Sequence, residues 1–289
     1  MPSTPVVVLD STLTNIANAI RSKTGGSALM TPGQMPAQIA SIPTGTLGIP
    51  REVSAQGVFQ MPSQSFSFSL PANATDVGSY ALSYAFESCA NLTSVDLSSL
   101  TTVSSRSALS YAFENCANLT SADLSSLTTV SGDSSFYSTF EKCYHITSVD
   151  FSSLTTVSGN SVFTYAFDGC TRLAPLSFPA LTTVSGNRAF SYAFESCNAF
   201  TSMSFPALTT LSGDGAFSYA FYQCSRLASL SFPALTTDSF GSSTNQFDHM
   251  LFLVSGCTVH FPASVQSIVE TMTGYPNFGG SNTTVLFDL

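Results

Sequence analysis

The sequence predicts an α/β-type solenoid, in which 27-residue repeats stack and form a parallel β-sheet. Two observations predict this fold. Leucine, valine and phenylalanine recur at fixed distances behind each cysteine of a regular series, and 44% of all residues are hydrophobic while only 9% are charged. A single coil cannot bury that many apolar side chains, so the coils must bury them against one another. The cysteines stand at an interval of 27 residues, at Cys89, Cys116, Cys143, Cys170, Cys197 and Cys224.

The segment after each cysteine has the spacing L-x-x-L-x-L, which predicts a strand. In the first repeat its apolar residues are Leu92, Val95 and Leu97, and the last two share one face of the strand because they are two residues apart. A second apolar pair follows, and then a Ser-Gly-Asp or Ser-Gly-Asn turn, where Gly and Asx tolerate positive φ. The return leg carries a phenylalanine and a Tyr-x-Phe turn into the next cysteine.

The ends of the repeat array divide the chain into four parts. Residues 66–70 are in phase with the first repeat and predict an N-terminal capping strand, and residues 259–263 predict a strand after the last repeat. Eight strands would give a stack of roughly 35 Å. We therefore expect a helical attachment module in 1–45, a linker and capping strand in 46–78, the solenoid in 79–256 and a helix-strand cap in 257–289, with its helix over 263–273.

The line A-F-x-x-C-x-x-L-x-x-x-x-[LF], which extends over about residues 66–262, resembles the BspA-type leucine-rich repeat. The units here are longer than those of the family by the Ser-Gly-Asn/Asp segment. The resemblance implies a leucine-rich repeat fold. It also implies a surface or secreted protein of bacteria, since known members are mostly of that kind and some are adhesins.

Residues 10–42 predict two short helices that dock on another surface. Two helices this short cannot form a core, so we expect them to bind another subunit or a second copy of the chain. The segment resembles the N-terminal module of tail and other virion-associated proteins of phages that infect Gram-positive bacteria. That resemblance implies attachment to a virus particle. The residues expected to dock are Leu13, Ile16, Ile20, Met35 and Ile39.

The cysteines allow three interpretations. An even series of six suits disulfides, but equivalent cysteines in neighbouring coils would lie near strand spacing, beyond the ~3.8 Å between Cβ atoms that a disulfide prefers. Metal binding needs convergent ligands, and one cysteine per coil does not converge. The interpretation that we favour is a column of buried free thiols, with Cys257 also free.

An acidic residue follows the phenylalanine of each Tyr-x-Phe turn. Like charges this close repel, so they must be solvated or must share a cation such as Ca²⁺. This acidic column consists of Glu87, Glu114, Glu141, Asp168 and Glu195.

Polar side chains alternate with the buried residues of the strands and face outward. Extended surfaces of repeat proteins suit partner recognition, so this polar strip is our candidate partner-binding site. It contains no aromatic residue on which a sugar could stack. The strip consists of Ser94, Asp96, Ser121, Asp123, Ser148 and Asp150, and it continues as Ser177, Ser204 and Ser231.

Composition and motifs exclude several classes of function. The net charge of −9 and the lack of basic clusters argue against nucleic acid and against an anionic membrane as partners. No apolar run approaches the ~20 residues of a membrane span, and the N-terminus has no secretory signal pattern. His145, His249 and His260 lie in no catalytic motif, so we expect no enzyme, cofactor or metal.

These observations lead to a predicted function. We expect a structural protein of a phage virion, in a tail fibre, tail tip or decoration role, that presents a rigid repeat surface for contact with a host-cell molecule. The alternative is a bacterial surface or secreted leucine-rich repeat adhesin. A third possibility is a scaffold that assembles without binding a host.

Overall fold

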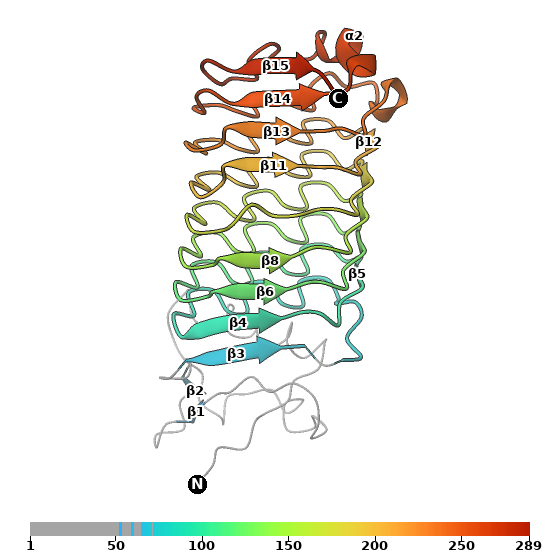
Figure 1. Ribbon diagram of the computed structural model, residues 1–289. Coiled ribbons are helices and arrows are strands. Elements are labelled where there is room, and N and C mark those ends of the chain that lie inside the picture. The colour runs from blue at the N-terminus through green and yellow to red at the C-terminus, as the bar shows by residue number, and fades with distance from the viewer. Residues whose placement is uncertain (1–51, 54–58, 61–64, 71) are drawn as a thin grey trace.

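The computed structural model describes residues 52–53, 59–60, 65–70 and 72–289. The predicted docking helices, with Leu13, Ile16, Ile20, Met35 and Ile39, lie outside the described residues. Two short strands, β1 (Glu52–Val53) and β2 (Phe59–Gln60), form an antiparallel pair. From β3 to β15 the chain forms a solenoid whose coils stack one above another (Figure 1).

The strand side of the solenoid consists of two four-stranded parallel sheets. Equivalent residues pair from coil to coil, as Ser121 does with Ser148. The predicted parallel solenoid, with about 27 residues in each of about eight turns, is confirmed. One sheet contains β3 (Phe66–Ser69), β4 (Leu92–Asp96), β6 (Ser121–Asp123) and β8 (Ser148–Asp150). The other contains β11 (Ser202–Ser204), β13 (Ser229–Ser231), β14 (Thr258–Phe261) and β15 (Thr284–Phe287).

The expectation of a strand in every repeat is wrong for one coil, because residues 174–178 form no strand between β8 and β11. Pro175 stands one period after Ser148, at the first residue of the strand. Proline fixes φ and has no N–H for a ladder hydrogen bond. The coil remains in the stack, because the ring of Phe178 lies 5.5 Å from that of Phe151. The sheet is therefore interrupted while the core beneath it is continuous.

A five-stranded parallel sheet, distinct from the two four-stranded sheets, follows the strand side in five of the coils, and the repeat pattern did not predict it. Its strands end on a buried valine or leucine of the second apolar pair. A column of threonines borders it: the Thr128 hydroxyl donates to the Thr101 carbonyl at 2.9 Å, and Thr155 repeats this contact with Thr128. Its strands are β5 (Thr102–Val103), β7 (Thr129–Val130), β9 (Thr156–Val157), β10 (Thr183–Val184) and β12 (Thr210–Leu211).

In the described repeats the return leg is a series of turns and contains no helix. Its N–H groups alternate between two kinds of partner. The N–H of Tyr111 donates to Tyr137 of the next coil at 2.8 Å, whereas the N–H of Ala112 closes a turn with Leu109 at 3.0 Å. Every fourth residue has positive φ, as at Ser107 (51°) and Tyr111 (57°). The backbone groups are thus satisfied between coils, which allows a leg of turns to stack like a sheet.

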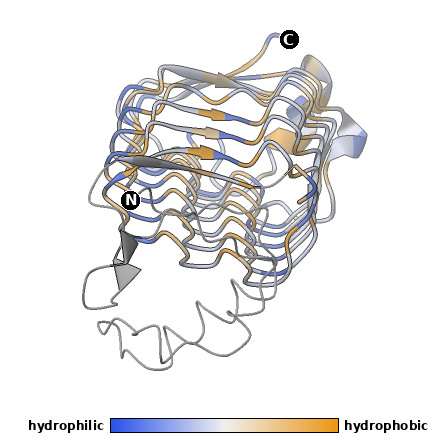
Figure 2. Cartoon of the chain, turned by 90° about the horizontal axis from the view of Figure 1, so that it is seen from below, coloured by the Kyte–Doolittle hydropathy of each residue, from blue (hydrophilic) through white to orange (hydrophobic). Residues whose placement is uncertain are grey.

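Columns of aromatic and sulfur side chains fill the interior. Phe113 stacks on Phe86 and on Phe140, with ring centroids 5.5 Å apart in both pairs. Cys143 donates its S–H to the carbonyl of Phe113 at 3.1 Å, and all seven cysteines are buried and free. Hydrophobic segments of successive coils lie over one another when the stack is seen along its axis (Figure 2). Stacked aromatic pairs add about 0.5–1.5 kcal/mol beyond the burial of their area.

The corner that follows the five-stranded sheet needs glycine, but not for the reason that we expected. The glycines of the Ser-Gly-Asp and Ser-Gly-Asn turns do not have positive φ. A Cβ atom added to Gly186 would lie 1.9 Å from the carbonyl oxygen of Gly159 in the preceding coil. The next residues form a column in which the N–H of Asn187 donates to Oδ1 of Asn160 at 3.0 Å. Close approach of backbones therefore selects glycine here, and the Asx side chains join the coils.

The last coils contain the little helix that the described residues have. One 3₁₀ helix, η3 (Thr237–Ser239), precedes the final coils, and a second, η4 (Ala263–Val265), leads into α2 (Gln266–Val269). The helix expected over 263–273 is thus only four residues of α-helix after one 3₁₀ turn. The final strand β15 pairs with β14 in parallel, with Val285 opposite Val259.

Candidate functional site

The structure brings the six residues of the predicted polar strip together on the outer face of β4, β6 and β8. In each strand the residue between the two strip positions is buried, as Val95 and Ala122 are at 2% and 4% exposure, so its neighbours point outward. Parallel pairing in register then aligns equivalent residues, with Ser94 beside Ser121 and Asp96 beside Asp123. The result is a row of hydroxyls next to a row of carboxylates.

A groove of about 660 Å³ lies over this strip. It is lined by β4, β6, β8 and residues 174–177. The groove therefore extends as far as Pro175, where the sheet is interrupted. Pro175 was not among the predicted site residues, although a proline at a strand position is a signal that the sequence carries.

Each aspartate of the strip holds the turn that follows it. Oδ1 of Asp123 accepts the N–H of Ser125 at 2.9 Å, and Oδ1 of Asp150 accepts that of Ser152 at 2.8 Å. Asp96 accepts both the hydroxyl and the N–H of Ser98, and these hydrogen bonds hold the pKa of Asp96 below its usual value. The three carboxylates are thus fixed in place, and that of Asp96 stays charged at neutral pH.

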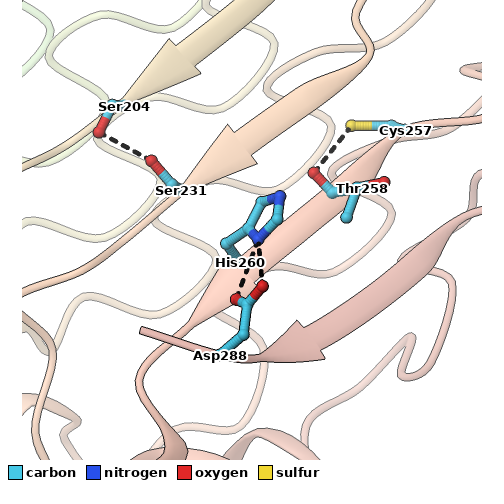
Figure 3. A network of polar contacts seen from close by, with 6 residues as sticks. All are labelled: Ser204, Ser231, Cys257, Thr258, His260 and Asp288. Atoms are coloured by element: carbon cyan, nitrogen blue, oxygen red, sulfur yellow. Dashed lines mark hydrogen bonds and ion pairs between the residues drawn. The ribbon is translucent and has the colours of Figure 1, made fainter.

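The C-terminal part of the same face has a different chemistry. Ser231 donates its hydroxyl to Ser204 at 2.8 Å, and Asp288 pairs with Nδ1 of His260 at 3.0 Å (Figure 3). In this described region no hydrogen bond joins Ser231 to His260. Ser231, His260 and Asp288 therefore do not form the proton relay that a serine nucleophile needs.

The acidic column lies on the return leg, with four of its five members partly buried. Lys142 forms an ion pair with Glu141 at 2.6 Å. Burial, with Glu141 as a second cause, raises the pKa of Asp168 to about 6, and burial with Asp168 and Glu141 raises that of Glu195 to about 7. Burial and the neighbouring Glu141 and Glu87 also raise the pKa of Glu114. Within the described ranges no group of three or more acidic, His or Cys side chains is placed to hold a metal ion.

A column of tyrosines runs beside the acidic column. The sequence-based predictions did not include it as a stacked column. Tyr84 stacks on Tyr111 at 4.5 Å, and Tyr192 on Tyr219 at 4.7 Å. The column ends on His249, whose ring lies 5.0 Å from that of Tyr219. The rings stack face to face toward both ends of the column, whereas Tyr137 in its middle lies tilted against Tyr111 and edge-on to Tyr165. The repeated Tyr-x-Phe motif was the signal that could have predicted the column.

The family comparison agrees with this architecture. The model of the BspA type leucine rich repeat region, with six copies, matches residues 55–192 and 138–272, so the chain belongs to this family. Among solved structures, a leucine-rich repeat protein of T. pallidum covers 81% of this chain and 95% of its own at 18% identity, with a TM-score of 0.43. The comparison with curated proteins returned no match.

The matching family model indicates no catalytic family and gives no support to a role in a phage. The resemblance of residues 10–42 to a virion module has no counterpart in that comparison, since the family match begins at residue 55. Among the described residues, no helix combines the length and the apolar character that crossing a bilayer requires.

Proposed function

We propose that the chain is a non-enzymatic recognition scaffold with an adhesin-like role, located at the bacterial surface or secreted. Membership of the BspA-type family supports this role, because proteins of this family are typically found at the surface or secreted. The observation that carries the proposal is the groove over the polar strip. Its hydroxyls and fixed carboxylates are suited to a partner that donates hydrogen bonds or carries positive charge.

The strip offers a matched pair of variants for testing the site. Ser121 and Ser148 line the groove, whereas Ser202 and Ser229 stand at the same strand position in coils outside it. None of these serines holds the turn that the aspartates hold, so arginine at these positions adds bulk and charge to the strand face without removing a turn contact.

The experiment measures binding of the purified full chain to a panel of host cells and immobilised host surface proteins. We expect the Ser121→Arg/Ser148→Arg variant to bind at least about tenfold more weakly, and the Ser202→Arg/Ser229→Arg control to stay within about twofold of the original protein. Circular dichroism and melting curves verify that both variants fold. Equal binding by the two variants, or no saturable binding by the original chain, would contradict the proposal.

The role in a phage virion is the weaker proposal, because it depends only on residues 10–42. Deleting residues 1–45 separates the two functions. Under the adhesin proposal the shortened protein still binds host cells. If the deletion instead abolishes incorporation into phage particles, the virion role and docking through residues 1–45 are correct.

A further inference from the structure

The acidic column is held at a fixed spacing by the backbone that carries it. The N–H of Lys142 donates to the carbonyl of Asp168 at 2.7 Å, and that of Gly169 donates to Glu195 at 2.9 Å. The backbone positions that carry the carboxyl groups therefore stand on neighbouring coils, at the ~4.8 Å spacing of paired strands. These backbone positions cannot separate unless the coils do.

The surroundings of Asp168 and Glu195 contain little positive charge. In this described region Glu141 and Lys142 act on the pKa of Asp168, and Asp168 and Glu141 act on the pKa of Glu195. Lys142 already pairs with Glu141. The other titratable groups nearby are phenols and thiols, whose pKa values burial raises, so they are neutral near pH 7. They are Tyr165, Tyr192, Cys170, Cys197 and Cys224.

The column also has a defined end. The next coils carry Tyr222 and Phe252 at the corresponding position, as the hydrogen bonds of Ser196 to Tyr222 and of Gln223 to Phe252 show. No described acid therefore follows Glu195 in this column. Asp168 and Glu195 are therefore the last two acids of the column.

We propose that the acidic column is a proton-linked stabilising element, in which protonation of Asp168 and Glu195 joins the central coils more tightly in mildly acidic surroundings than at neutral pH. A protonated carboxyl group removes the repulsion between coils and lowers the cost of partial burial. The repeats of a solenoid are coupled mainly to their neighbours, so the effect is largest in these coils.

The direction of the pH dependence follows from the pKa values. In the unfolded chain Glu195 and Asp168 ionise near the ordinary values of 4.5 and 3.8, whereas in the folded chain their pKa values are about 7 and about 6. Between these limits the folded state binds more protons than the unfolded state. Stability therefore falls as the pH rises from about 4 to about 7 and changes little above that range.

The test compares thermal unfolding of the full chain and of variants at about pH 5 and about pH 8. We expect the original protein to melt at least about 3 °C higher at the lower pH. At the higher pH the Asp168→Asn/Glu195→Gln variant should melt at a higher temperature than the original protein. Its own melting temperature should differ little between the two pH values. Glu195→Gln alone should show a smaller change of the same sign. Hydrogen exchange should locate the gain in the coils around residues 141–197.

Asp214→Asn is the matched control for Asp168→Asn. It also removes one negative charge, but hydrogen bonds from Ser243 and Asn245 lower the pKa of Asp214, and asparagine already occupies this column at Asn187. We expect no gain at high pH from this control. Imidazoles as a class ionise in the same range, and the three histidines are unchanged in every variant. If the double variant keeps the original pH dependence, or if the control abolishes it, the proposal is wrong.

Discussion

The N-terminal and C-terminal halves of the sheet face close the same turn in two ways. In the coils of β4, β6 and β8 an aspartate accepts the N–H of a serine two residues later, as Asp123 does from Ser125 at 2.9 Å. In the later coils a serine stands at the aspartate position and a proline two residues later, as in Ser204 and Pro206. Proline has no N–H, so no acceptor is needed.

This difference explains why the negative charge of the face is concentrated in one half. The carboxylates are part of the turn and are present wherever the turn still has an N–H to satisfy. The groove acquires its acidic side from this local requirement. A partner that recognises the carboxylates would therefore bind groups whose positions the fold already holds.

The largest effect is expected at the glycines of the Ser-Gly-Asp and Ser-Gly-Asn turns, which occur in both halves. Gly132→Ala and Gly186→Ala would each place a Cβ atom within 2.2 Å of a backbone oxygen of the preceding coil. Because backbone cannot move away without breaking the stack, we expect each change to lower the free energy of unfolding by about 3 kcal/mol or more. Urea denaturation measures this, with Ser105→Ala as a control that adds no atom. A tolerated alanine in one half alone would show that the halves differ at the corner as well.

A smaller effect is expected where the halves differ. Asp123→Ser removes the charged acceptor of the Ser125 N–H, and we expect a loss of about 1 kcal/mol in the free energy of unfolding. Adding Ser125→Pro removes the donor too, and should recover most of that loss. Urea denaturation of the single and double variants forms the test. If the double variant is less stable than Asp123→Ser, proline and aspartate are not alternative solutions.

The smallest effect is expected for the reverse change. Pro206→Ser introduces an N–H at an exposed turn, where water and the Ser204 hydroxyl accept it, so the cost should be only about 0.5 kcal/mol or less. Adding Ser204→Asp should then restore or exceed the original stability. A loss of more than about 1 kcal/mol in the urea midpoint analysis would mean that Pro206 stabilises the turn by more than removing a donor.

The period of the sequence was sufficient to predict most of the candidate site. Alternation along a strand and an interval of 27 residues place Ser94, Ser121 and Ser148 on one outer face, whatever the rest of the coil does. The extent of the groove was not predicted, because it depends on the interruption at Pro175 and on the space above the strip. The acidic column was predicted as a row, but the burial that shifts its pKa values was not.

The sequence by itself determined that equivalent residues lie in columns, because a strict repeat must give every coil the same environment. Only the tertiary structure decided how the coils meet. It shows that glycine is required by the carbonyl of the coil before it, that aspartate holds a turn, and that Asp168 and Glu195 share one crowded edge. These contacts lie between residues one full turn apart, and local periodicity does not specify how closely two backbones approach.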